Sequence, residues 1–194
     1  MDDTTAARPT AALPAAIATF RPSTGACRWE GVDEHAYKEE GSAPFRAITR
    51  RVLFGDPRLS CELRYFEVAP GGYSTLERHE HVHGVMILRG AGTCLVGGEV
   101  RAVAMHDLVS IPPMAWHQFR AAPDAPLGFL CMVDVARDRP QLPTEAELAA
   151  LRRDPAIAAF LDGRGARRLR RARAGSARCA RRAGTWCRPR PCRP

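Results

Sequence analysis

Four of the six histidines in this 194-residue chain stand where metal chemistry is expected. His79, His81 and His83 alternate along the sequence, and His117 follows in the segment IPPMAWHQF. Residues two apart on a strand face the same side, so the three alternating imidazoles share a face with the apolar Val85. Imidazoles turned into an apolar interior need a common partner, and a metal ion satisfies them together. This spacing therefore predicts a metal site.

The same spacing sets a geometric condition on the site. In a fully extended strand the Cα atoms of His79 and His83 would lie about 13 Å apart, near the limit at which two imidazoles can share one ion. A bend or bulge within residues 80–82 is therefore expected, and such irregularities do occur beside active sites. The alternative is a polar strand end whose imidazoles face solvent or make ordinary hydrogen bonds.

The segments that must position these histidines have the pattern of an all-β barrel or sandwich. From about Ala47 to Asp134 the chain divides into short runs with turn signals about every eight to twelve residues. The predicted strands are 47–54, 61–68, 73–79, 84–90, 92–97, 99–104, 107–111, 115–119 and 127–133. Gly71-Gly72 and Gly97-Gly98 predict tight turns, and Pro112-Pro113 predicts a break in strand pairing.

After the barrel the pattern changes to that of two short helices, at 145–153 and 155–162. Thr144 followed three residues later by Glu147 has the form of a capping box. Asp154-Pro155 has the form of an N-cap with a proline in the first turn of the second helix.

Length and composition favour one globular domain, residues 19–163, between two disordered tails. Residues 1–18 are rich in Ala, Pro and Thr, and residues 164–194 contain 12 Arg and no Asp or Glu. Without that basic tail the formal net charge changes from +8 to −4, which argues against nucleic-acid binding by the folded part. No apolar run approaches the roughly 20 residues of a membrane helix, and the acidic start is unlike a secretion signal. A cytoplasmic location with free cysteines is expected.

Two segments resemble the paired motifs of single-domain cupins, which are small β-barrel metalloproteins. They are PGGYSTLERHEHVHGVMILRGAG (70–92) and MHDLVSIPPMAWHQFRA (105–121). Val85 stands where the first motif usually has Glu, so the resemblance is to the four-His variant, in which His83 replaces that Glu. The residues that match the motifs directly are Gly72, His79, His81, Gly90 and His117.

The resemblance implies a fold and a ligand set. The fold is a single cupin barrel, also called a double-stranded β-helix or jelly roll, with short C-terminal helices outside it. The implied metal ligands are His79, His81, His83 and His117. Cupins commonly pair, so a homodimer is expected, with residues 46–54 as a segment that can be exchanged.

Blocks outside the metal motif are similar to the bacterial cupins that act as S-methyl-1-thio-D-xylulose 5-phosphate methylthiotransferases (methylsulfurylases). The blocks are CELRYFEVAPGG (61–72), STLERHEHVH (74–83), PPMAWHQFRAAPDAPLGFLCMV (112–133) and RDRPQLPT (137–144). That family implies Mn²⁺, glutathione as the thiol acceptor and 1-deoxy-D-xylulose 5-phosphate as the product, which links methylthioadenosine salvage to isoprenoid precursors. We therefore expect a manganese-dependent enzyme that takes a sugar phosphate and glutathione.

The implied reaction assigns roles to further residues. Loss of a methylthio group beside a carbonyl leaves a negative charge that spreads into the carbonyl as an enolate. A metal ion stabilises this enolate, and an acid must then protonate the carbon. Glu77, expected on the inner face, is the candidate acid, with a surface ion pair as the alternative. Cys131, in GFLCMV, is the candidate nucleophile or transient methylthio carrier, with a buried core thiol as the alternative. The candidate substrate ligands are Lys38, Arg64, Tyr65 and Arg89.

Two other functions fit the same histidines. Neutral nitrogen ligands do not select one metal, so Fe²⁺, Ni²⁺, Cu²⁺ and Zn²⁺ remain alternatives to Mn²⁺. A cupin dioxygenase or related oxidative metalloenzyme is therefore the second interpretation. A non-catalytic cupin that binds a metal or a small molecule is the third.

Overall fold

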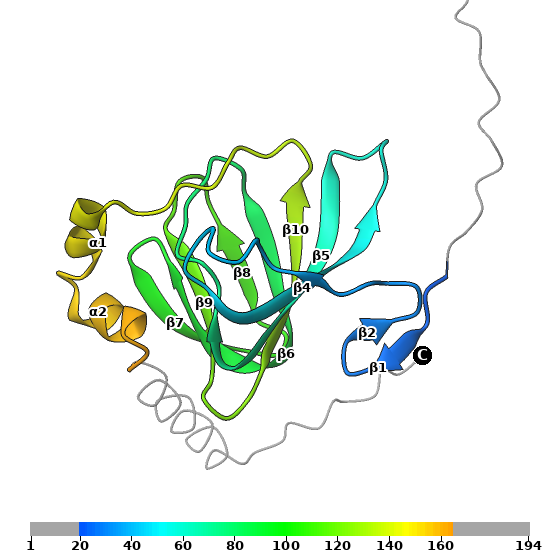
Figure 1. Cartoon of the computed structure of the whole chain (residues 1–194), viewed down its shortest axis with the longest axis horizontal. Helices are drawn as coiled ribbons and strands as arrows, with labels where there is room; N and C mark the ends of the chain where they lie inside the picture. The colour runs from blue at the N-terminus through cyan, green and yellow to red at the C-terminus, as the bar shows by residue number, and fades with distance from the viewer. Residues whose placement is uncertain (1–19, 165–194) are drawn as a thin grey trace, which may run out of the picture. The chain divides into compact units, whose positions relative to one another are not determined.

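The computed structural model describes residues 20–164 (Figure 1). The predictions for residues 1–18 and for 165–194 lie outside the described residues. The described chain divides into two units, residues 20–31 and residues 32–164. The first unit is a short antiparallel hairpin of β1 (Ser23–Gly25) and β2 (Arg28–Trp29). The second unit contains every other described helix and strand.

The second unit is an antiparallel barrel with additional strands on its outside. Its strands are β3 (His35–Ala36), β4 (Arg46–Gly55), β5 (Cys61–Tyr73), β6 (His83–Val96), β7 (Glu99–Ala104), β8 (Leu108–Ile111), β9 (His117–Ala121) and β10 (Leu127–Asp134). Both β9 and β10 pair with β5 and also with β6, which closes the ring. β4 then extends the sheet beyond β5. The predicted all-β barrel is confirmed.

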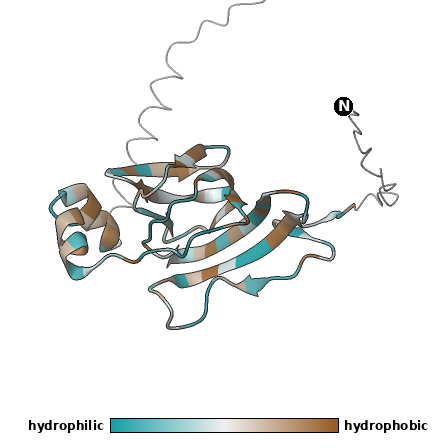
Figure 2. Ribbon diagram, turned by 90° about the horizontal axis from the view of Figure 1, so that it is seen from above, coloured by the Kyte–Doolittle hydropathy of each residue, from teal (hydrophilic) through white to brown (hydrophobic). Residues whose placement is uncertain are grey.

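The barrel has an apolar interior because hydrophobic and polar residues alternate along the strands (Figure 2). Val85 and Ile87 of β6 are both in this core, as the sequence pattern predicts. Their buried companions include Ile48, Val68, Ile111, Phe119, Leu127 and Phe129. Cys27, Cys61, Cys94 and Cys131 are free thiols, as expected. No helix of the described chain is long and apolar enough to cross a membrane.

Two predicted strand boundaries that lie at glycines are wrong. The predicted turn at Gly71-Gly72 is absent, because β5 continues through it to Tyr73. A Cβ on Gly72 would lie 2.6 Å from the carbonyl oxygen of Arg46, so this glycine permits close approach of two strands. The predicted strands 84–90 and 92–97 form one strand, β6, which passes through Gly90 at a positive φ of 70°.

The two predicted helices are confirmed as α1 (Glu145–Leu151) and α2 (Pro155–Leu161). The Thr144 hydroxyl accepts a hydrogen bond from the backbone of Glu147, and the Glu147 carboxylate accepts one from the backbone of Thr144. Asp154 caps α2 in the predicted way. The helices cover a second apolar cluster outside the main core, built from Leu76, Leu95, Ile157 and Phe160.

Candidate metal centre

The segment that joins β5 to β6 carries the histidines and is not a regular strand. The predicted strand at 73–79 is wrong, because only an isolated bridge between Glu77 and His117 pairs this segment with β9. The backbone bends at Glu80 and His81, so the predicted bend is confirmed. The Asp138 carboxylate accepts hydrogen bonds from the backbone N–H groups of these two residues, at 2.8 and 3.2 Å. These bonds provide acceptors for two backbone N–H groups that do not pair with a neighbouring strand.

The bend brings three imidazoles together from two parts of the chain. The ligand nitrogens of His79, His83 and His117 lie within 4.8 Å of one another, in a group able to bind a metal ion. His83 begins β6 and pairs with Ile111 of β8, whereas His117 begins β9 and pairs with Val96 at the other end of β6, so each strand contributes one corner of the group. The His79 and His117 side chains are almost fully buried, with 1% and 5% of their surface exposed.

Hydrogen bonds fix which nitrogen of each ring is free. Nδ1 of His79 donates to the carbonyl oxygen of His81 at 2.8 Å, and Nδ1 of His117 donates to that of Ala115 at 3.0 Å. A carbonyl oxygen only accepts, so Nδ1 carries the proton and Nε2 keeps its lone pair in both rings. The Nε2 atoms of His79 and His83 are buried without a hydrogen-bond partner. Such atoms fit an electron-pair acceptor such as a metal ion.

His81 lies beside this group of three. Its ring stacks on that of His79, with centroids 3.6 Å apart, and its Nδ1 is 2.5 Å from a carboxylate oxygen of Asp138. His79, His81 and Asp138 therefore form a second group of ligand atoms that adjoins the first. The structure brings the four predicted ligands into one cluster, but only three of them into the first group.

The surroundings keep the imidazoles of His79, His83 and His117 neutral. Burial lowers the pKa of His79 and of His117 to about 4, and that of His83 to about 2. Neighbouring imidazoles contribute in the same direction, because a second positive charge nearby would be unfavourable. Neutral imidazole is the form that binds a metal.

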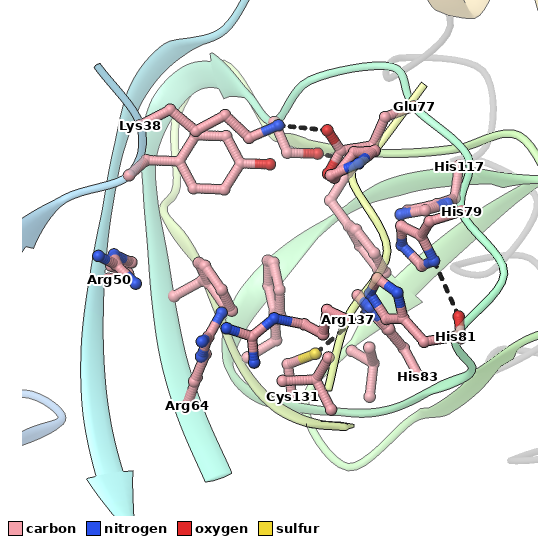
Figure 3. Close-up of a pocket in the computed structure, with 18 of the residues that line it drawn as sticks. Lys38, Arg50, Arg64, Glu77, His79, His81, His83, His117, Cys131 and Arg137 are labelled. Carbon is pink, nitrogen blue, oxygen red and sulfur yellow. Dashed lines mark hydrogen bonds and ion pairs between the residues drawn. The ribbon is translucent and has the colours of Figure 1, made fainter. Parts of the chain in front are cut away.

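The imidazoles line one cavity of about 160 Å³ (Figure 3). Glu77 also faces it, is 7% exposed and forms an ion pair with Lys38. Val85 occupies the wall at the position where the general motif has Glu. Aromatic side chains and arginines complete the lining, among them Tyr37, Phe66, Phe129, Arg50, Arg64 and Arg137.

Cys131 lines the same cavity from β10. Its Sγ lies 3.4 Å from Nδ1 of His83, and its side chain is 2% exposed. Burial raises the pKa of this thiol to about 12, so the sulfur stays protonated at neutral pH. Cys131 is therefore a buried, protonated thiol in contact with His83.

The four predicted substrate ligands divide into two pairs. Lys38 and Arg64 line the cavity. Tyr65 and Arg89 do not, because both side chains turn to Glu67: the Tyr65 hydroxyl donates to it at 2.7 Å and Arg89 pairs with it at 2.8 Å.

Several cavity residues were missed by the sequence analysis. Tyr37, Arg50, Arg137 and Asp138 all line the cavity, although none belongs to the histidine motifs. Asp138 and Arg137 lie in the block RDRPQLPT, which is similar to the methylthiotransferase cupins, but the sequence assigns no role to either residue. Alternation from Val52 places Arg50 on the inner face of β4, but only the pairing of β4 with β5 indicates that this face adjoins the cavity.

Comparison with known proteins agrees with this geometry. The family model described as "Cupin domain" matches residues 64–133. The chain is 67% identical over 144 residues to the 1-methylthio-D-xylulose 5-phosphate methylsulfurylase of Rhodospirillum rubrum, covering 74% of this chain and 92% of the relative.

Two solved structures support the same relationship. A crystal structure of a cupin-2 domain from Rhodospirillum rubrum is 65% identical, with a TM-score of 0.69 over 75% of this chain and 98% of that one. A cupin 2 conserved barrel domain protein from Rhodopseudomonas palustris is 59% identical, with a TM-score of 0.70 over 73% and 98% of the respective chains.

Proposed function

The chain belongs to the cupin family, and on that premise we propose that it is a methylsulfurylase that acts on 1-methylthio-D-xylulose 5-phosphate, the compound also called S-methyl-1-thio-D-xylulose 5-phosphate. The observation that carries the proposal is the 67% identity to the Rhodospirillum rubrum methylsulfurylase across 92% of that protein. The imidazole-lined cavity supports it, since it offers a site for a metal beside acid–base groups.

The proposed reaction transfers the methylthio group to glutathione. The glutathione sulfur attacks the methylthio sulfur, the carbon–sulfur bond breaks, and its electron pair passes to the carbon next to the carbonyl. That carbon takes up a proton, which balances the proton lost by the thiol. The products are 1-deoxy-D-xylulose 5-phosphate and a mixed disulfide, so the sugar carbon is reduced and the glutathione sulfur is oxidised.

The donor set fits a divalent metal, for which we propose Mn²⁺. His79, His83 and His117 would hold it with His81 as the fourth ligand, and the partnerless Nε2 atoms of His79 and His83 are the observation behind this fit. A bound divalent ion supplies Lewis acidity, which favours negative charge on the substrate carbonyl. Four neutral ligands add no negative charge that would weaken it.

Glu77 is the group proposed to move the proton. Its carboxylate lies in the cavity wall and pairs with Lys38. A carboxylate in the wall of the cavity can come within hydrogen-bond reach of a bound substrate, which general acid–base catalysis requires. We propose that Glu77 accepts the thiol proton and that the pair returns a proton to the carbon.

For Cys131 we propose a positioning role, in which its sulfur accepts the Nδ1–H of His83. Cys131→Ser is expected to keep methylthio transfer within about tenfold of wild type while weakening metal affinity, as changes beside metal ligands do. Metal titration and steady-state kinetics measure the two effects. Loss of transfer, together with a methylthio adduct on Cys131 in wild-type protein incubated with substrate alone, would show that the thiol carries the group instead.

The test of the function is an assay of the purified full-length protein with Mn²⁺, the methylthio sugar phosphate and glutathione. We expect 1-deoxy-D-xylulose 5-phosphate and the mixed disulfide in equal amounts by mass spectrometry. Failure to form either product would reject the function. Oxygen consumption with an iron-, nickel- or copper-loaded protein would favour the oxidative alternative.

We also propose that the protein works as a homodimer in the cytoplasm. Met86, Leu108 and Met132 are exposed apolar side chains on neighbouring strands, and such side chains favour association. Glutathione is the thiol of reducing compartments, which supports a cytoplasmic location. Light scattering coupled to gel filtration tests the dimer, and a monomer mass would contradict it.

A further inference from the structure

We propose that Arg50, Arg64 and Arg137 form the subsite that binds the phosphate group of the substrate. The inference rests on the proposed function, which makes the substrate a sugar phosphate, and it assigns the phosphate to one part of the cavity. A phosphomonoester carries a charge of about −1.5 to −2 near neutral pH and offers three acceptor oxygens. Guanidinium groups match both its charge and its geometry.

The three arginines reach the cavity from three different segments. Arg64 extends from β5, opposite Cys131 of the paired strand β10, and Cys131 contacts His83. Arg50 comes from β4, and Arg137 follows β10. All three line the cavity that holds the imidazoles, and Figure 3 shows them at one end of it. One ligand can therefore contact the arginines and the imidazoles together.

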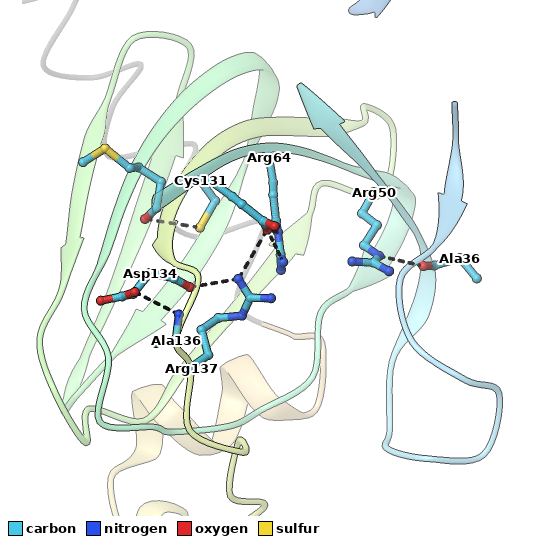
Figure 4. A network of polar contacts seen from close by, with 9 residues as sticks. Ala36, Arg50, Arg64, Cys131, Asp134, Ala136 and Arg137 are labelled. Carbon is cyan, nitrogen blue, oxygen red and sulfur yellow. Dashed lines mark hydrogen bonds and ion pairs between the residues drawn. The ribbon is translucent and has the colours of Figure 1, made fainter. Parts of the chain in front are cut away.

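The charge of this group is not balanced by the described part of the chain. The Glu62 carboxylate accepts hydrogen bonds from Arg64, at 2.8 Å from Nε, and from Arg137, at 3.3 Å from Nη1 (Figure 4). Arg50 donates from Nε to the carbonyl oxygen of Ala36 at 3.2 Å, and none of the ion pairs among residues 20–164 includes it. Lys38 and Glu77 offset each other, and Glu62 and Asp138, which also lines the cavity, offset two of the three guanidinium charges, so a net positive charge remains.

Three other arginines of the barrel show ordinary structural pairing with a carboxylate, and none of these three lines the cavity: Arg51 with Glu34, Arg89 with Glu67 and Arg101 with Glu99. Guanidinium groups that share one carboxylate repel one another, and an anionic ligand between them removes that repulsion. The excess charge inside the cavity therefore indicates a site for an anion.

Calorimetric titration of the full-length protein with D-xylulose 5-phosphate and with D-xylulose isolates the contribution of the phosphate. Wild-type protein is expected to bind the phosphorylated sugar more tightly. Arg50→Ala and Arg64→Ala should each reduce this preference by about 10- to 100-fold, the usual effect of losing a hydrogen bond to a charged group. Binding of D-xylulose should be unchanged. Arg101→Ala, at the surface, is the matched control and should keep the full preference.

Arg64→Lys retains the charge without the fork geometry, and we expect it to lose less of the preference than Arg64→Ala. It also guards against misfolding, which a thermal melt of each variant checks. A phosphate preference that survives Arg50→Ala, Arg64→Ala and Arg137→Ala would overturn the subsite. So would variants that weaken glutathione binding but not sugar-phosphate binding, since the arginines would then serve the carboxylates of the thiol.

The titration needs no turnover, so its result is separate from that of the functional assay. An arginine-dependent phosphate preference in a protein that transfers no methylthio group would support the subsite and reject the proposed function. Methylthio transfer with no such preference would reject the subsite alone.

Discussion

At the scale of single residues, the partners of each imidazole decide what its ring can do. Backbone carbonyls hold the Nδ1 protons of His79 and His117, and a sulfur atom adjoins Nδ1 of His83. Burial then keeps these rings neutral. Their remaining nitrogens are prepared as ligands before any metal arrives, and this reduces the reorganisation that binding requires.

His83→Ala removes one of the four proposed ligands and should leave the purified protein with little bound metal, because only two nitrogens of the closest group then remain beside His81. Elemental analysis measures the metal per chain. His35→Ala, on the exposed strand β3, is the control and should retain the wild-type metal content. Equal metal in the two variants would contradict the assignment of His83.

Glu77→Gln keeps the size of the side chain but cannot transfer a proton. We expect kcat to fall by about 10²- to 10⁴-fold, the usual contribution of general acid–base catalysis, with metal content unchanged. Steady-state kinetics in parallel with elemental analysis checks both parts. Glu99→Gln, in an exposed pair with Arg101, should have wild-type activity. A Glu77→Gln variant with normal kcat would assign the proton transfer to another group.

At the scale of elements, the irregular segment between β5 and β6 is what makes the site. A regular strand would spread the alternating histidines, whereas the bend at Glu80 and His81, held by Asp138, brings them together. β5 enters this segment from a close crossing at Gly72, where two strands approach without room for a side chain. The geometry of the site therefore depends on strand ends as much as on its own residues.

Gly72→Ala should destabilise the protein by about 1–3 kcal/mol, because the added Cβ would lie 2.6 Å from the Arg46 carbonyl oxygen and force the backbone to move. Chemical denaturation measures the free energy of unfolding. Gly98→Ala is the control, since a Cβ there has no neighbour within 4 Å. If both substitutions have the same effect, the close approach at Gly72 is not a constraint.

At the scale of the whole molecule, the barrel buries the imidazoles of His79, His83 and His117, and this burial favours their neutral form. That burial links the stability of the metal-free protein to pH. The pKa values of His79 and His117 in the folded state are about 4, and that of His83 is about 2, against an ordinary value of 6.5. At pH values between the folded-state pKa values and 6.5, the unfolded chain binds more protons than the folded chain. The free energy of unfolding therefore rises with pH in this range.

We therefore expect metal-free protein to be most stable above about pH 6.5 and to lose stability steadily as the pH falls toward 4. Thermal melts of chelator-treated protein at several pH values measure this loss. His117→Gln removes one buried titrating ring and should show a shallower decline. Stability that is independent of pH between 6.5 and 5 would mean that the imidazoles are not buried as neutral groups.

The local pattern of the sequence determined the all-β class, both helix caps and the identity of the clustered histidines. These features depend on alternation, capping residues and residue spacing, all of which act within a few positions. The need for a bend near residues 80–82 also followed from strand geometry alone. The strand boundaries at Gly72 and Gly90 were wrong, because a glycine that permits close approach looks the same in sequence as one that makes a turn.

Only the tertiary structure decided what surrounds the histidines. Asp138 accepts hydrogen bonds from the backbone of Glu80 and His81, which lie far from it in the sequence. Arg50 reaches the cavity because β4 pairs with β5. Tyr65 and Arg89 turn to Glu67 and away from the cavity. Such contacts depend on which strands become neighbours. An alternating pattern is compatible with many strand pairings, and only closure of the barrel selects one of them.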